Sequence, residues 1–303
     1  MIGPTPFRDI MIVATFEIRE MFRTKRIVVM VALYLLGGLL AAEGFVSFLA
    51  TIESAAAEAL GAAATRTPGA LTNALLEDPT YRGMIASFLH DDKLTDWLLS
   101  LPPMAVFFGW VSFAMVPSLI VLTSTDYVAR ETQRRGIRFL IVRTGRLEVV
   151  VGKLAAQVLS TAIVVLLMGL VFVGVALHGL QGASLGPLMM GILEFWPRVV
   201  VYGLAFIGLT ALFATNARST NMARALSLIA LVGIYILDGV GSIVVHLGWE
   251  DVGELIHFLL PFIHGKALWT PDILELVPNA LVLVGLAFFY TLGALLIFAR
   301  RDL

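Results

Sequence analysis

Cysteine is absent from this chain of 303 residues, and charged side chains are few. Without cysteine there can be no disulfide, thiolate metal site, iron–sulfur cluster or cysteine nucleophile. Charged residues make up 14% of the sequence and apolar residues 59%, with a mean hydropathy of +0.91. So few charges cannot cover a surface that faces water. The composition excludes a soluble enzyme and predicts an integral membrane protein.

An excess of either charge is also missing. The chain has 21 basic and 22 acidic residues, so its net charge is −1. A nearly neutral protein has no general attraction for a phosphate backbone. We therefore expect no nucleic-acid partner.

Six apolar runs are candidates to cross a bilayer as helices. About 20 apolar residues span the ~30 Å of hydrocarbon at 1.5 Å per residue. The predicted spans are residues 27–49, 104–125, 154–177, 199–214, 225–246 and 278–299. The fourth run is the shortest, and it could extend backwards through Trp196 and Pro197. The predicted fold class is an all-α integral membrane protein with six transmembrane helices.

Basic residues gather in the segments on one side of these spans. Lys and Arg near the ends of a span are retained on the cytoplasmic side of the membrane. If the N-terminus is cytoplasmic, 16 of the 21 basic residues lie on that side. The five on the outer side are Arg66, Arg82, Lys93, Arg198 and Lys266. We therefore predict a multi-pass protein of the cell membrane, inner or plasma, with both termini cytoplasmic.

Residues 1–26 precede the first span and are predicted to form a cytoplasmic helix in the membrane interface. An apolar stripe and a charged face alternate over residues 7–22 with helical spacing. The stripe consists of Phe7, Ile10, Met11, Ala14, Ile18, Met21 and Phe22. The alternative is a simple extension of the first span, because Ile12, Val13 and Phe16 fall off the stripe.

Three segments lie on the predicted outer side. Residues 50–103 are Ala-rich at first and broken by prolines, which predicts several short helices packed outside the membrane. The apolar run around Pro261, within residues 249–277, is too short to cross the bilayer. We expect this second segment to enter the outer leaflet and return. The stretch from Pro187 to Pro197 could do the same.

The cytoplasmic segment 126–153 holds seven of the basic residues. Two helical pieces with a glycine break fit its sequence, basic on one side and apolar on another. Its charged residues include Glu131, Arg134, Arg135, Arg138 and Arg143. Such a segment can contact anionic lipid or a soluble partner.

No motif for catalysis is complete, and no catalytic residue is predicted. Six residues separate Gly145 from Gly152, whereas a phosphate-binding loop has four, and Leu154 stands where that loop needs Ser or Thr. Asp238 has no second aspartate in another span, as an intramembrane aspartyl protease would require. None of the five histidines pairs with a second ligand at helical spacing, so no metal site is predicted.

Two acidic residues, Glu43 and Asp238, fall within predicted spans. An acid at the centre of a span costs ~2.5–3.5 kcal/mol on insertion scales, so it usually faces protein or water. Two interpretations stay open. Both residues belong to a transport path, or Glu43 lies near the outer headgroups and Asp238 hydrogen-bonds to a neighbouring helix.

The order of these parts resembles the permease subunits of ABC-2-type exporters over essentially the whole chain. Three stretches carry the likeness: Phe16-Glu17-Ile18 with the basic residues 23–26, Ala129-Arg130-Glu131 through Arg146 to Gly152-Lys153, and the ending 298–303. They resemble the N-terminal elbow helix, the cytoplasmic coupling segment and the usual C-terminus of the family. Thr144-Gly145 stands where the family often has proline. The long outer segment is most similar to the gliding-motility and copper-enzyme-maturation branch.

The resemblance implies that this chain holds no cofactor itself. A separate cytoplasmic ATP-binding subunit would bind ATP and Mg, and it would dock on the coupling segment. A second permease copy or a paralogue would complete a dimer in the bilayer. Closure of the ATP-binding subunits would then switch the permeases between inner-closed and outer-open states.

The resemblance also places the dimer interface and the translocation path along the second and fifth spans. The path candidates are Phe107 and Trp110, Tyr235, Asp238 and Ser242, and also Glu43. The three candidates in the fifth span share one helical face, because they are three and four residues apart. A mostly aromatic lining suits an amphipathic or lipid-like cargo. The alternative is that the aromatic residues only pack helices or lie in the outer aromatic belt.

Two other classes of function remain open at this point. One is an ion- or proton-coupled transporter that works without an ATPase, in which Glu43 and Asp238 would carry the ions. The other is an integral membrane scaffold that transports nothing. Co-purification with an ATP-binding subunit distinguishes an ABC permease from both.

The distribution of basic residues predicts that residues 50–103 are accessible from outside the cell. The chain has no cysteine, so Thr72→Cys supplies a single reactive thiol. A membrane-impermeant maleimide should label this thiol in intact cells. Labelling only from the cytoplasmic side, in inverted vesicles, would overturn the predicted topology.

Overall fold

The computed structural model describes residues 6–23, 25–59, 68–69, 79–124, 146–217 and 219–300. Its helices are α1 (Pro6–Arg23), α2 (Lys25–Ala59), α4 (Pro79–Leu89), α5 (Asp92–Ser100), α6 (Pro103–Ser124), α9 (Arg146–Gly179), α10 (Leu185–Asn216), α11 (Thr220–His246), α12 (Glu250–Phe258), α13 (Pro261–Ala267) and α14 (Ile273–Arg300). No strand occurs in the described residues, and six helices are long and apolar enough to cross a membrane. The predicted class, an all-α integral membrane protein, is confirmed.

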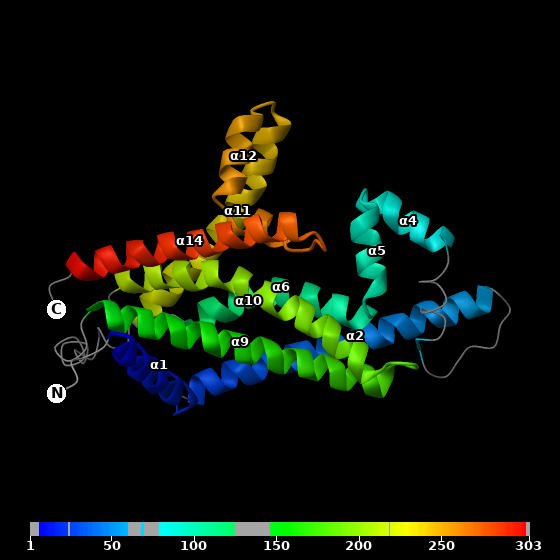
Figure 1. The fold of residues 1–303 in the computed structure, drawn as a ribbon, viewed down its shortest axis with the longest axis horizontal. Helices are drawn as coiled ribbons and strands as arrows, with labels where there is room; N and C mark the ends of the chain where they lie inside the picture. The colour runs from blue at the N-terminus through cyan, green and yellow to red at the C-terminus, as the bar shows by residue number, and fades with distance from the viewer. Residues whose placement is uncertain are drawn as a thin grey trace.

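The long helices run along the longest axis of the molecule, as α2, α9 and α14 show in Figure 1. Both chain termini lie at one end of this axis, which we call the terminal end. Helices α4 and α5 lie toward the opposite, distal end. The distance between the two ends follows from helix length, because α2 alone rises about 50 Å at 1.5 Å per residue.

Helix α10 is the centre of the bundle. It packs against α6, α9, α11, α13 and α14, and with α6 it is the most buried of the six candidate spans. Large side chains of α10 and of the helices packed against it are fully buried. They are Phe195 and Phe206 of α10, Phe108 of α6 and Phe172 of α9. The core of the protein is therefore built around one helix rather than between two layers.

The structure corrects the predicted fourth span, residues 199–214. Helix α10 begins at Leu185, so the proposed outer dip between Pro187 and Pro197 is wrong. Pro197 stays inside the helix, as neighbouring helices permit in a membrane. The indole of Trp196 donates to the carbonyl of Ala162 on α9 at 2.8 Å. The hydropathy of the sequence falls near Pro197, which suggested that the span begins after it. Contacts with neighbouring elements, such as that of Trp196, allow the helix to continue there.

The first span is also longer than predicted. Helix α2 continues past residue 49 to Ala59, so the start of the outer segment 50–103 is an extension of the span. Two further helices of that segment, α4 and α5, are described. Asp91 caps α5 by accepting a hydrogen bond from the backbone of Leu94 at 3.0 Å.

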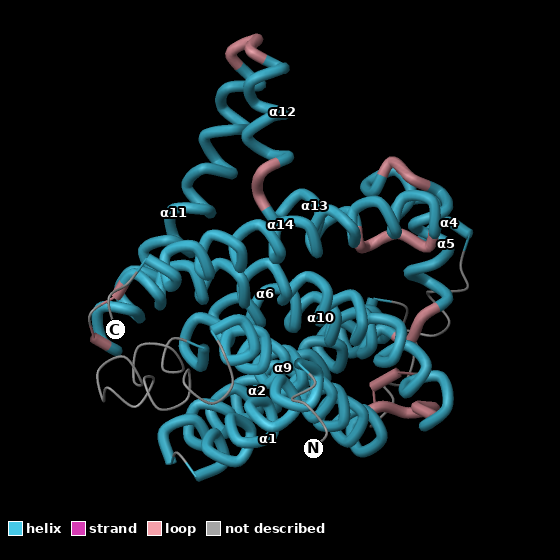
Figure 2. Tube along the Cα trace, turned by 60° about the vertical axis from the view of Figure 1, so that its left-hand side comes forward, coloured by secondary structure: helices cyan, strands magenta, loops and turns pink. Residues whose placement is uncertain are grey.

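The N-terminal helix α1 folds back against α9 beside α2, as Figure 2 shows. The predicted apolar stripe of α1 coincides in part with the face that the protein buries, because Ala14 and Met21 are buried and Ile10 and Ile18 are half-buried. Val13 and Glu17 are buried, whereas Phe7 and Met11 of the stripe are exposed, and so is Phe16. The helix has two apolar faces, one against α9 and one free to meet lipid. Sequence periodicity alone does not tell these two faces apart.

Helices α11 and α12 form a hairpin that projects sideways from the bundle, which both views show (Figures 1 and 2). The turn between them contains Gly248 with φ of +87°, a conformation that favours glycine. A Cβ atom at Gly253 on α12 would lie 2.9 Å from the carbonyl oxygen of Gly241 on α11. The two helices are therefore packed backbone to backbone. The predicted return of residues 249–277 through the outer leaflet stays a prediction.

The contact between α10 and α14 generates a prediction about Gly208. A Cβ atom at this position would lie 2.6 Å from the carbonyl oxygen of Ala287, a backbone atom that cannot turn aside. We expect Gly208→Ala to destabilise the bundle by about 1–3 kcal/mol, the usual cost of overpacking. The melting temperature of the purified protein in detergent measures it.

Gly233→Ala is the matched control, because a Cβ atom at Gly233 in α11 meets nothing within 4 Å. Both substitutions have the same effect on helix propensity, so their difference isolates the contact. Equal melting temperatures for the two variants would contradict the close approach of α10 and α14.

Candidate functional site

A buried ion pair joins the N-terminal helix to α9 at the terminal end. The Lys153 ammonium of α9 donates to the Glu17 carboxylate of α1, and both side chains are about nineteen-twentieths buried. Neither charge could stay in an apolar environment alone, because desolvation costs several kcal/mol per ion. The pair therefore holds α1 against α9 at one defined position.

The residue before this lysine brings the two helices close together. A Cβ atom at Gly152 would lie 2.7 Å from Cβ of Val13 and 2.9 Å from the carbonyl oxygen of Ile10. Only glycine allows this approach, so Gly152 and Lys153 together make a joint between α1 and α9. We call these two residues, with Glu17, the elbow joint.

Gly152 and Lys153 of the elbow joint lie about two helical turns after Arg146, the first residue of α9. The residues that precede α9 include the predicted ATPase-coupling residues, and they lie outside the described part of the chain. Those residues are Glu131, Arg134, Arg135, Arg138 and Arg143. Their role remains a prediction.

Polar side chains continue from the elbow joint into the bundle. The Gln157 amide donates to Oγ1 of Thr123 at 3.3 Å. Gln157 and Ser124 line a cavity of about 30 Å³ together with Lys153. Among the described residues, the Gln157 carbonyl oxygen and the Ser124 hydroxyl have no hydrogen-bond partner. A cavity of this size and polarity can hold one water molecule that satisfies both.

The structure separates the predicted path candidates into two groups. Phe107 stacks on Phe45 of α2 with ring centroids 4.3 Å apart, and Trp110 follows at 5.8 Å from Phe107. Trp110 is 62% exposed and Glu43 is exposed on α2. These residues lie on the side of α6 that faces α2 and α9.

The other group surrounds a cavity of about 180 Å³ between α6, α10, α11 and α13. We call it the aromatic cavity. Its lining residues are Phe113, Tyr202, Tyr235, Asp238, Phe262, Gly265, Lys266 and Trp269. Tyr235 and Asp238 were predicted path candidates, whereas Ser242 lies one turn further along α11 and does not line the cavity. The predicted shared face of α11 thus leads to this cavity.

Asp238 meets a lysine and a histidine that the sequence did not connect with it. Its carboxylate oxygens lie 3.9 Å from the Lys266 ammonium and 3.9 Å from Nε2 of His257. The same His257 nitrogen is 3.4 Å from the Ser242 hydroxyl. His257 and Lys266 are 19 and 28 positions after Asp238, so helical spacing could not reveal that they lie near it.

Arg198 fixes one wall of the aromatic cavity. Its guanidinium donates to the carbonyl oxygens of Leu268 and Thr270, each at 2.9 Å, and so holds the backbone on both sides of Trp269. It also pairs with Glu194 at 3.0 Å. The sequence marked Arg198 only as a basic residue of the outer side.

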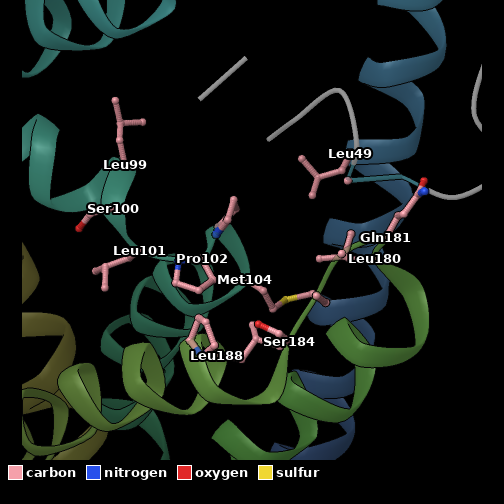
Figure 3. A pocket seen from close by; sticks show the side chains of 15 residues that line it. Leu49, Leu99, Ser100, Leu101, Pro102, Met104, Leu180, Gln181, Ser184 and Leu188 are labelled. Atoms are coloured by element: carbon pink, nitrogen blue, oxygen red, sulfur yellow. The ribbon is translucent and has the colours of Figure 1, made fainter. Parts of the chain in front are cut away.

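A second, larger cavity of about 440 Å³ opens at the distal end. Figure 3 shows Leu101, Met104 and Leu188 around it, together with the turn that holds Gln181. None of its lining residues is charged. The distal cavity is therefore an uncharged hollow, lined by apolar side chains together with the polar Ser100, Gln181 and Ser184.

A group of three His, Asp or Glu side chains that could hold a metal ion does not occur in the described residues. The distinctive chemical features are the elbow joint and the aromatic cavity.

The elbow joint generates a prediction about stability. Lys153→Met leaves the Glu17 carboxylate buried without its cation, so we expect a loss of about 3–5 kcal/mol. The double variant Glu17→Leu, Lys153→Met should recover much of this loss, because two apolar side chains need no solvation. Thermal unfolding of the purified protein measures both.

The control for this prediction is the exposed pair of Arg82 with Asp96, whose side chains are more than half exposed. Arg82→Met should change stability by no more than about 1 kcal/mol. If Lys153→Met were as mild as Arg82→Met, the ion pair would not hold α1 on α9.

Comparison with known proteins agrees with this architecture. The family model described as ABC-2 family transporter protein matches residues 11–303. The search of curated proteins gave no match. The match covers nearly the whole chain, from within α1 to the C-terminus. The chain therefore belongs to the ABC-2 family of transporter proteins, as a membrane permease component.

Proposed function

We propose that this chain is the transmembrane subunit of an ATP-driven exporter, working with a separate cytoplasmic ATP-binding subunit. The observation that carries the proposal is the elbow joint. It ties α1 to α9 just inside the point where α9 emerges from the cytoplasmic segment. In this scheme ATP and Mg are bound by the partner, and this chain catalyses no reaction itself.

The elbow joint suggests how movement would pass from the ATPase into the membrane. A push on residues 126–145 would reach the first turns of α9 directly. Since Gly152 and Lys153 lock α9 to α1, the two helices would move as one body. Movement of α9 would then reach α10, against which it packs along the bundle. Rigid helices that shift between two packed arrangements are a common way to transmit such a change.

The proposed cargo is amphipathic or lipid-like. The aromatic cavity has five aromatic residues but only two charged ones in its lining. The distal cavity has no charged lining residue at all. Cavities with so few charged groups offer little to an inorganic ion, and their apolar and aromatic side chains favour apolar surface.

We also propose that a second permease copy or paralogue pairs with this one through the α11–α12 hairpin. The hairpin projects from the bundle and has large apolar side chains on its surface, including Ile229, Ile236 and Ile243. These three isoleucines repeat every seven residues, the spacing of a helix–helix seam. A partner hairpin would cover this stripe.

The orientation and the finer family position belong to the same proposal. Both termini would be cytoplasmic, as the excess of basic residues at the terminal end supports. The long segment between α2 and α6 supports a place in the gliding-motility and copper-enzyme-maturation branch.

Docking of the ATP-binding subunit on Glu131 is testable against the alternative, anchoring of the basic segment to anionic lipid. Lipid attracts basic residues at ~1 kcal/mol each and is indifferent to loss of an acidic one. We therefore expect Glu131→Ala to reduce co-purification of the ATP-binding subunit and substrate-coupled ATP turnover severalfold. Glu148→Ala is the control, because it removes an acidic residue from the same cytoplasmic stretch.

Unchanged association and turnover in Glu131→Ala would remove the docking role assigned to that residue. Failure of any ATP-binding subunit to co-purify with the unaltered chain would contradict the proposed function as a whole. A transporter driven by ions, or a scaffold, would give that second result.

A further inference from the structure

We propose that the aromatic cavity binds a quaternary ammonium group, the charged end of an amphipathic molecule. This inference rests on the proposed function in one respect, because it names the chemistry of the amphipathic cargo. It is otherwise independent of any ATP-binding subunit. The cavity holds several aromatic residues and one acid, Asp238, within the membrane-spanning bundle.

The walls of the aromatic cavity come from separate elements. Phe113 of α6 lies 5.0 Å from Tyr202 of α10 and 5.6 Å from Trp269, between ring centroids. On the other side, Tyr235 of α11 lies 4.2 Å from Phe262 of α13. Aromatic rings attract an organic cation through their negative faces, and Trp and Tyr do so best. Five such rings around one space are the main feature of a quaternary ammonium site.

Asp238 provides the opposite charge. The Lys266 ammonium and Nε2 of His257 are both 3.9 Å away, beyond hydrogen-bond distance, and Lys266 is 78% exposed. No hydrogen bond to the Asp238 carboxylate occurs within the described part of the chain. The carboxylate is therefore loosely held and can face another cation. A quaternary ammonium has no N–H group, so charge and ring faces are all that it needs.

The size of the aromatic cavity suits a headgroup and not a whole amphiphile. Its volume of about 180 Å³ is below the roughly 300–1,000 Å³ of pockets that enclose a drug-sized ligand. Tyr235 lines the cavity and is 48% exposed. An apolar tail can therefore leave the cavity past the ring of Tyr235. The exposed Lys266 at the rim can meet an anionic group next to the ammonium.

The protein holds the walls of the aromatic cavity in position. A Cβ atom at Gly265 would lie 2.5 Å from the ring of Tyr202, so glycine lets α13 close against that ring. Arg198 fixes the backbone on both sides of Trp269, as described above. A preformed site loses less entropy on binding than one that must be ordered.

The test uses the purified full-length permease in phosphatidylglycerol nanodiscs, without ATP. Choline is the probe, and saturation-transfer NMR of its N-methyl protons reports binding. The neutral isostere 3,3-dimethylbutanol has the same shape without the charge, and ethanolamine has a primary ammonium. We expect choline to bind at least about tenfold more tightly than the isostere, since only the cation is attracted by the faces of the aromatic rings and by Asp238. Ethanolamine should bind more weakly than choline.

Two variants connect the signal to the cavity. Asp238→Asn keeps the side-chain shape and removes the charge, and Tyr235→Leu removes one ring from an exposed position. Each should weaken choline binding severalfold. Ser242→Ala is the matched control, because it lies one turn from Asp238 on α11 and outside the lining. Melting temperatures show whether each variant is folded, and Tyr235→Leu serves if Asp238→Asn is not.

Equal binding of choline and its neutral isostere would overturn the proposal, and so would full choline binding by both variants. Phosphatidylcholine nanodiscs identify the source of the ligand. Loss of the choline signal in those discs means that membrane lipid fills the site, and retention means that it takes a soluble amphiphile. If the permease binds choline but no ATP-binding subunit co-purifies with it from cells, only the proposed function is contradicted. Association without choline binding would contradict this inference only.

Discussion

The bilayer cannot solvate polar groups, and the rest of the structure depends on this constraint. Backbone N–H and C=O groups must find partners inside the protein, which makes continuous helices the available solution. Prolines lie inside three of the spans, at Pro117, Pro197 and Pro278, and of these only Pro117 is buried among neighbouring helices. Charges obey the same constraint, so each one in or near a span indicates either a structural pair or a function.

The charged groups of this chain divide by how tightly they are paired. Glu17 with Lys153 is buried and in direct contact, and Arg198 is bound to Glu194 and to two backbone carbonyls. These pairs hold helices together and have little freedom to bind anything else. Asp238 is different, because the nearest basic groups, the Lys266 ammonium and Nε2 of His257, are 3.9 Å from its carboxylate oxygens. Asp238 is therefore loosely paired and lies beside aromatic rings, as in a binding site, whereas the Glu17–Lys153 and Arg198–Glu194 pairs hold the structure together.

Helix α10 links these features along one axis. Near its C-terminus, Thr215 lines the small polar cavity beside Lys153, and at its middle Tyr202 lines the aromatic cavity. Nearer its start, Arg198 and Glu194 fix the loop that carries Trp269. A shift of α10 relative to α9 would therefore alter the aromatic cavity. This arrangement fits a permease in which movement at the cytoplasmic end changes a cargo site deeper in the membrane.

The sequence by itself determined the class and the number of spans, because a run of about 20 apolar residues has one stable structure in lipid. It also singled out Asp238 and Tyr235 by their cost and spacing. Only the tertiary structure decided that Val13 and Glu17 join the buried face of α1 while Phe7 and Met11 stay exposed, since that helix has two apolar faces. Pro197 and Arg198 concealed the true start of α10, because the Arg198 guanidinium is bound by the loop after α13, a contact that no local pattern shows. His257 and Lys266 reach Asp238 through the fold of α12 and α13, and a contact across such turns leaves no periodic signal in the sequence.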